Sequence, residues 1–220
     1  MRTDRQLQED VLKALEWDPG VNAARIGVSI KNGVATLQGF VPTFLEKVHA
    51  GRIARHVFGI RAVANDVAVS LDGLLPHTDA QIAEAVVNAI AWDSAVPLNA
   101  IKATVAGGWV TLTGIVDWQY QKSAAQIDAE RVTGVKGVDN FVTLKPAPRV
   151  NASDVKAKIE AAFRRSAEVD SAHVKVEAKD GQVILTGRVR SLFERDEAER
   201  AAWAAPGVTL VDDRIQVSPF

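Results

Sequence analysis

The stretch GWVTLTG, residues 108–114, reads as a turn that leads into a β-strand, with a glycine at each end. Two other segments repeat it with small changes, GVATLQG at 33–39 and GQVILTG at 181–187. A glycine-rich phosphate loop and a copied β-hairpin are the two interpretations of such a stretch. A phosphate loop needs Lys and Ser or Thr after its glycines at a strand-to-helix junction. These segments lack that pattern, so the hairpin is favoured.

The three stretches belong to a longer internal repeat. Gly39 lies 75 residues before Gly114, which lies 73 residues before Gly187. The same offsets align three apolar stripes with i, i+4, i+8 spacing, which is typical of amphipathic helices. These stripes are Leu7, Val11 and Leu15; Ile82, Val86 and Ile90; and Val155, Ile159 and Phe163. The sequence therefore predicts three tandem domains, at residues 1–73, 74–147 and 148–220.

Within each repeat the period of the pattern changes in a fixed order. A capped helix (Thr3, Thr78 or Asn151 at its N-cap) precedes two strands of alternating polarity, which are joined by a two-residue turn. An Ala-rich helix and a last strand follow, the latter at 60–69, 135–144 and 208–217. We therefore expect an α+β fold of three αββαβ units. In each unit, two helices pack on one face of a three-stranded mixed sheet.

Three glycines in each repeat have assigned structural roles. The first is expected in the hairpin turn, where φ is positive. The second lies on the inward side of the second strand, where a missing side chain would let a helix backbone approach. The third is expected at the C′ position of the second helix. They are Gly33, Gly39 and Gly59; Gly108, Gly114 and Gly134; and Gly181, Gly187 and Gly207.

Composition narrows the class of protein. The 26 basic and 27 acidic residues nearly balance, which argues against a nucleic-acid partner. There is no cysteine, and the acidic start of the chain does not resemble a signal peptide. No apolar run approaches the length of a membrane span. We therefore expect a cytoplasmic protein without a transmembrane segment, or a periplasmic one if a leader was removed.

At this point the pattern resembles the BON domain, the bacterial osmotically inducible and nodulation module. The resemblance rests on the turn-strand segments quoted above, on the Ala-rich helix, and on the endings with Asn65, Asn140 and Asp213. It covers nearly the whole chain three times. It implies the fold expected above and an association with osmotic and envelope stress. It further implies binding of phospholipid or potassium, and it carries no catalytic signature.

The residues themselves predict no enzyme. Four histidines are present, His49, His56, His77 and His173, and their spacing fits no catalytic triad or metalloprotease motif. No cofactor is expected, and a metal site is left open. Asp212 and Asp213 are adjacent carboxylates, but an exposed strand start explains them better than a cation site.

Candidate binding residues are aromatic or basic. Repeat two alone carries Trp109, Trp118 and Tyr120, either as a seam between repeats or as an exposed partner surface. Trp17 and Trp92 match each other at the end of the first helix and are expected in the core or at a hinge. The basic candidates are Lys47, Arg52, Arg55, Arg188 and Arg190.

Three hypotheses follow for the function. The leading one is a non-enzymatic interaction protein that engages anionic phospholipid or a protein partner through these residues. The second is a small-cation binder, with potassium implied by the resemblance. The third is a self-associating scaffold, because each sheet leaves two edges for pairing with another copy.

Overall fold

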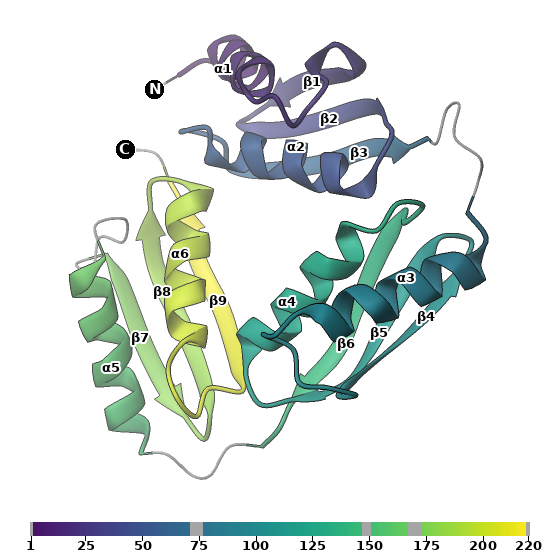
Figure 1. Ribbon diagram of the computed structural model, residues 1–220. Helices are drawn as coiled ribbons and strands as arrows, with labels where there is room; N and C mark the ends of the chain where they lie inside the picture. The colour runs from purple at the N-terminus through teal and green to yellow at the C-terminus, as the bar shows by residue number, and fades with distance from the viewer. Residues whose placement is uncertain (1, 71–76, 147–150, 167–172, 219–220) are drawn as a thin grey trace.

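Three units with the same order of elements make up the computed structural model (Figure 1). The structure describes residues 2–70, 77–146, 151–166 and 173–218. Unit 1 consists of α1 (Asp4–Trp17), β1 (Ile26–Lys31), β2 (Val34–Val41), α2 (Phe44–His56) and β3 (Ala62–Val69). Unit 2 consists of α3 (Asp79–Trp92), β4 (Ile101–Ala106), β5 (Trp109–Val116), α4 (Gln119–Glu130) and β6 (Gly137–Leu144). Unit 3 consists of α5 (Ala152–Arg165), β7 (Val174–Lys179), β8 (Gln182–Val189), α6 (Leu192–Trp203) and β9 (Leu210–Val217).

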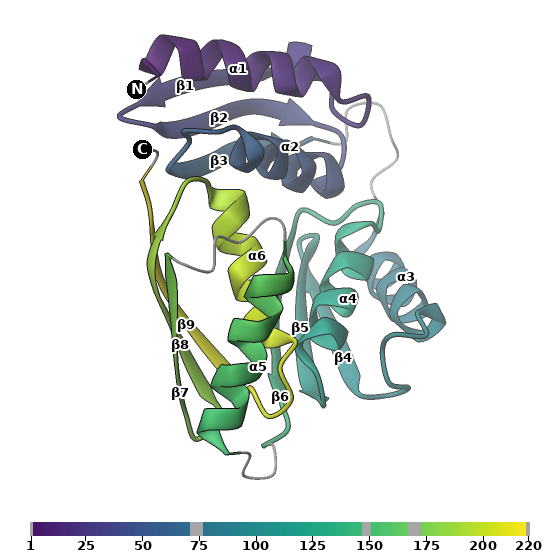
Figure 2. The same cartoon turned by 90° about the vertical axis from the view of Figure 1, so that its left-hand side faces the viewer.

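The predicted αββαβ order and α+β class are confirmed. In each unit the middle strand pairs antiparallel with the first strand and parallel with the last. Both helices cover one face of the sheet (Figure 1 and Figure 2). The two predicted domain boundaries, after residues 73 and 147, fall outside the described residues and stay predictions.

The first helix of each unit begins at a side chain that caps it. Thr3 Oγ1 accepts a hydrogen bond from the Gln6 N–H at 3.3 Å, and the Gln6 side chain accepts one from the Thr3 N–H at 2.9 Å. Thr78 and Gln81 repeat this capping box in unit 2, and Asn151 caps α5. The predicted N-caps are therefore confirmed. The apolar stripes that follow them are buried in all three units.

Each hairpin turn has the left-handed backbone that its sequence predicts. In unit 1, Asn32 has φ 53° and Gly33 has φ 75°. The Asp4 carboxylate accepts hydrogen bonds from both of these N–H groups, at 2.8 and 3.0 Å. Asp79 does the same for the hairpin of unit 2, whereas unit 3 has Ala152 at this position. The start of the first helix thus fastens the hairpin in two of the three units.

The glycine inside the second strand has a different neighbour from the one expected. A Cβ on Gly39 would lie 2.0 Å from the carbonyl oxygen of Arg25, which ends a short 3-10 helix (η1, Ala23–Arg25) before β1, and not beside α1 or α2. Gly114 and Gly187 meet the carbonyl oxygens of Ala100 and His173 in the same way, at 2.1 and 2.0 Å. The expectation of a helix contact was wrong because this glycine pairs with the first residue of the preceding strand. The chain that enters that strand therefore crosses directly over it.

The third glycine of each unit also differs in detail. Gly59, Gly134 and Gly207 have the expected positive φ, at 101°, 95° and 88°. They lie one or two residues beyond the C′ position, so that assignment was wrong. In unit 1 the Ile60 N–H donates to the Val57 carbonyl at 3.2 Å, which closes a four-residue turn around Gly59. Positive φ at the third position is typical of a type II turn, in which glycine is favoured.

Small residues let the second helix of each unit pack closely on its sheet. Six alanines, two in each of these helices, have no exposed surface, as their alignment in the sequence predicts. They are Ala50, Ala54, Ala125, Ala129, Ala198 and Ala202. Each unit has its own buried core around them.

The three units contact one another through their second helices. Helices α2, α4 and α6 lie toward the middle of the molecule, and α2 packs on α6 (Figure 1 and Figure 2). Leu192, the first residue of α6, is buried in the core cluster of unit 1. Phe44, the first residue of α2, packs against the core of unit 2. Unit 1 therefore contacts both of the other units.

None of the helices in the described ranges has both the length and the apolar composition that a membrane crossing needs.

Replacing Gly39 with alanine is expected to destabilise unit 1 by about 2 kcal/mol or more, because the new Cβ overlaps the Arg25 carbonyl and φ is +135°. Gly27→Ala is the control in the same sheet, since its Cβ would meet only the Gln38 carbonyl oxygen at 3.7 Å. Urea unfolding followed by hydrogen exchange in peptides of unit 1 measures both variants. Equal stability of the two variants would contradict the role assigned to the crossing.

Candidate functional site

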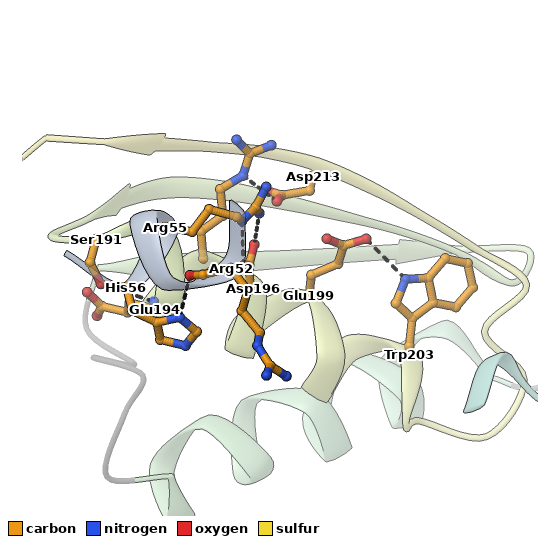
Figure 3. A network of polar contacts seen from close by, with 10 residues as sticks. Arg52, Arg55, His56, Ser191, Glu194, Asp196, Glu199, Trp203 and Asp213 are labelled. Carbon is orange, nitrogen blue, oxygen red and sulfur yellow. Dashed lines mark hydrogen bonds and ion pairs between the residues drawn. The ribbon is translucent and has the colours of Figure 1, made fainter. Parts of the chain in front are cut away.

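The junction of α2 and α6 is a charged and aromatic contact between unit 1 and unit 3 (Figure 3). Arg55 forms two bonds with Asp196, Nε to Oδ2 at 3.1 Å and Nη2 to Oδ1 at 2.5 Å. Beside them, the His56 ring lies 4.7 Å from the Phe193 ring at an interplanar angle of 41°. A two-pronged guanidinium–carboxylate pair fixes orientation as well as distance. It therefore sets how the two helices face each other.

The start of α6 is held in place by its own polar side chains. Ser191 Oγ accepts a hydrogen bond from the Glu194 N–H at 3.1 Å. The buried Glu194 carboxylate accepts the Arg190 N–H at 2.9 Å and lies 3.7 Å from Arg190 Nε. Leu192, between them, is thereby presented to the core of unit 1. Arg190, a predicted binding residue, thus contributes to the cap of α6.

A polar side chain on the last strand fastens the second helix in every unit. Asn65 Nδ2 donates to the Lys47 carbonyl at 2.7 Å, and Asn140 Nδ2 donates to the Lys122 carbonyl at 2.9 Å. In unit 3 the contact joins two charged side chains, because Arg195 Nε donates to the Asp213 carboxylate at 2.6 Å. The sequence pattern identified these endings but not their role. Asp213 is thereby assigned to an ion pair within unit 3.

A groove of about 1160 Å³ separates α4 of unit 2 from α5 and α6 of unit 3. Trp118 and Tyr120 line it from α4 and are 40% and 59% exposed, and Trp203 lines it from α6. Glu199 accepts a hydrogen bond from Trp203 Nε1 at 3.3 Å and so fixes the plane of that indole (Figure 3). The groove also contains Arg165. Sequence reasoning singled out the first two aromatic residues and missed the side chains that unit 3 contributes.

A second groove, of about 670 Å³, lies between α1 and α2 of unit 1. Its lining includes Lys13, Trp17, Arg52 and His56. Trp17 is 89% exposed, as is Trp92 at the matching position of unit 2, so the expectation of a core position was wrong, while the alternative of a hinge stays a prediction. The buried stripe of each helix ends two residues earlier, at Leu15 or Ile90. Two residues further along a helix, a side chain points to the opposite side.

The remaining predicted residues are dispersed over the molecule. Trp109 lies over Gly137 of its own sheet and donates to Asp139 at 2.7 Å, so it lines neither groove. Arg188 is exposed on β8. Lys47 contributes its backbone carbonyl to the contact with Asn65. Of the predicted basic residues, only Arg52 lines either of these two grooves. The groove that it lines also contains an exposed aromatic residue, Trp17.

A pair of carboxylates lies where α3 and α4 of unit 2 meet. Asp128 Oδ2 is buried without a hydrogen-bond partner. Burial first, and then the charge of Asp93, raise the pKa of Asp128 to about 6, although Arg131 acts in the opposite direction. A proton on Asp128 allows a hydrogen bond to Asp93. In unit 1, Asp18 Oδ2 lies 3.1 Å from His49 Nε2 in this region.

Metal-ligating side chains do not converge in the described ranges, where no group of three or more His, Asp or Glu residues is suited to hold an ion. Potassium sites use backbone carbonyls as much as side chains, so potassium binding stays a prediction.

The comparisons with known proteins agree with the repeat architecture. The sequence model of the BON domain matches residues 3–70, 78–146 and 151–219. Osmotically-inducible protein Y of Escherichia coli (strain K12) is 30% identical over 148 residues, which span 64% of this chain and 73% of that protein. A solved structure of CdsD, a structural protein of the type III secretion system of Chlamydia trachomatis, is 13% identical and covers 98% of this chain and 93% of its own. The TM-score between that structure and this chain is 0.29.

Reversing the charge of Arg55 tests the α2–α6 junction. Arg55→Glu places two carboxylates together and is expected to separate unit 1 from unit 3, which raises the radius of gyration in small-angle X-ray scattering. The double variant Arg55→Glu, Asp196→Arg restores the opposite charges and is expected to restore the compact form. An unchanged radius in the single variant would show that the ion pair does not set the arrangement.

Asp128→Asn is expected to stabilise unit 2 at pH 8 and to lose this advantage as the pH falls. The folded-state pKa of Asp128, about 6, is above its ordinary value of 3.8. Between these two pH values the unfolded chain releases the proton and the folded chain keeps it, so the fold loses stability as the pH rises through this window and does not regain it above pH 6. Below about pH 4 both proteins carry a neutral group, and their melting temperatures should converge. Thermal melts from pH 4 to 8 measure this, with a gain of a few degrees expected at the alkaline end. Asp93→Asn removes the repulsion but leaves Asp128 buried, so it should give a smaller gain at pH 8 that is also lost as the pH falls. A gain independent of pH would contradict the assignment.

Proposed function

Because this chain belongs to the BON domain family, we propose that it is a non-catalytic, stress-associated binding protein that attaches to anionic phospholipid surfaces. The stress association rests on the relative named osmotically-inducible protein Y. The proposed location is the cytoplasm, at the inner face of the membrane. A protein partner at the same surface is the other occupant that the experiment below distinguishes.

The observation that carries the proposal is the exposed indole of Trp17 between basic side chains. Trp17 ends α1, and Lys13 lies one turn earlier on that helix. Arg52 lines the opposite wall of the same groove from α2. Indole rings settle at the level of lipid headgroups because one edge is apolar and the other donates a hydrogen bond. Lysine and arginine beside the ring add attraction to anionic headgroups.

The strength of this attachment is modest. Each basic residue close to an anionic surface contributes about 1 kcal/mol, and salt weakens that contribution. Two such residues and one indole therefore give weak, reversible binding. Such attachment responds to the charge of the membrane and to ionic strength.

The other two units lack this combination. In unit 2, Trp92 is equally exposed, but Asn88 and Ile127 stand at the positions of Lys13 and Arg52. In unit 3, Arg165 replaces the tryptophan. Unit 2 therefore provides a matched control within the same chain.

Co-sedimentation with vesicles tests the proposal. The chain is expected to sediment with phosphatidylglycerol-containing vesicles at low salt, to bind them more weakly at physiological salt and to dissociate at higher salt. Trp17→Ala and the pair Lys13→Gln, Arg52→Gln should each reduce the bound fraction severalfold. Trp92→Ala should leave it unchanged.

Two results would contradict the proposal. Equal losses of vesicle binding from Trp17→Ala and Trp92→Ala would show that any exposed indole of the protein binds the vesicles, with or without basic neighbours. Absence of binding to anionic vesicles at low salt would exclude lipid at this surface and leave a protein partner as the occupant.

A further inference from the structure

Two helical faces meet across the groove between unit 2 and unit 3, and both present side chains at the same spacing. On α4 these are Tyr120, Ser123, Ala124 and Ile127, and on α6 they are Asp196, Glu199, Arg200 and Trp203. Each set follows i, i+3, i+4, i+7, so each forms one stripe of its helix. Small side chains in the middle of the α4 stripe leave room between the helices.

The lining of this groove combines aromatic rings with charged side chains. Trp118, Tyr120 and Trp203 supply three aromatic rings, and Glu199 is the carboxylate bonded to the Trp203 indole. Arg165, an exposed residue at the end of α5, adds a cation to the same groove. The other charged residues of the lining form ion pairs, Asp196 with Arg55 and Glu197 with Arg200. Besides these pairs, the groove offers aromatic rings, the Glu199 carboxylate and the Arg165 guanidinium.

The ligand that matches this lining has a cationic end without N–H groups and an anionic end. A quaternary ammonium group cannot donate hydrogen bonds, and aromatic faces attract it through their quadrupole. The Glu199 carboxylate adds to this attraction at short range. The Arg165 guanidinium pairs with a carboxylate or phosphate by hydrogen bonds and charge. An ammonium ion such as that of lysine loses more hydration on entering an apolar groove, which disfavours it.

We propose that the groove between α4 and α6 binds a quaternary ammonium zwitterion, in which a trimethylammonium group is linked to a carboxylate or a phosphate. Trp118, Tyr120 and Trp203 bind the trimethylammonium group, and Glu199 is a positioning residue for Trp203. Arg165 binds the anionic end. This site is separate from the unit 1 surface proposed for anionic lipid.

The matching positions in the other units do not reproduce the site. Thr43 and Ser191 stand where unit 2 has Trp118. Arg55 and Glu130 stand where unit 3 has Trp203. At the α2–α6 junction, that Arg55 is already paired with Asp196. The chain therefore holds one such site among the described residues.

Isothermal titration of the unmodified chain gives the first test, with choline and its neutral carbon isostere, neohexyl alcohol. The two probes have the same shape and differ in charge, so cation–π binding predicts that choline binds about tenfold more tightly. Equal affinity, or no binding of either probe, would overturn the proposal. This comparison does not depend on any variant folding correctly.

Variants then assign the two ends of the ligand. Trp203→Ala and Trp118→Ala should each weaken glycine betaine binding about tenfold, while Trp109→Ala and Trp92→Ala, which change exposed indoles outside the groove, should not. Arg165→Gln should weaken glycine betaine but leave choline unchanged, because choline has no anionic group. Glu199→Gln retains an acceptor for the Trp203 indole and should weaken both ligands, whereas Glu199→Ala should weaken them further. Equal losses of choline and betaine in Arg165→Gln would overturn the assignment of the anionic end.

The trimethylammonium group exists both in free solutes and in lipid headgroups. Free phosphocholine and phosphatidylcholine vesicles distinguish these sources. Binding of the vesicles that Trp203→Ala abolishes and Trp17→Ala does not would assign the groove to a lipid headgroup. Binding of phosphocholine without binding of the vesicles would assign it to a free solute. Failure of both would contradict the proposal while leaving the anionic-lipid test of unit 1 unaffected.

Discussion

The crossing of the chain over Gly39, Gly114 or Gly187 is the contact on which each unit depends. A carbonyl oxygen occupies the space where any other residue would have its Cβ, so the chain enters the first strand at one fixed place. That place sets the register of the hairpin, and the register decides which side chains face the helices. The same constraint occurs three times.

The repeat and its topology could be predicted from the sequence because they depend on local patterns. Helical stripes, alternating strands and glycine turns are each encoded within a few residues. The neighbour of Gly39 was predicted incorrectly because the sequence marks a close approach without naming the atom that approaches. Trp17 was expected in the core or at a hinge because it matches Trp92 at the end of the first helix, yet its position lies off the buried stripe.

Contacts between the units had no comparable signal. Arg55 and Asp196 are separated by 141 residues, and both lie on exposed faces that carry many other charges. The groove between α4 and α6 combines Trp118, recognised as unusual, with Trp203, whose role depends on how unit 3 is placed. Only the structure shows that Trp118 and Tyr120 of unit 2 and Arg52 of unit 1 line different grooves. The two proposals follow from that separation, since one combines an indole with cations and the other combines aromatic rings with both charges.

The central claim is that the three units hold one fixed arrangement, so that the groove between them exists before any ligand binds. The chain has no cysteine, which allows spin labels at chosen sites. Exposed residues on the first helices serve for this purpose, with Glu16→Cys, Asn88→Cys and Lys158→Cys combined in pairs. Double electron–electron resonance is expected to give one narrow distance distribution for each pair, in agreement with the structure. Broad distributions for the pairs that include unit 3 would show independently moving units and would contradict the account.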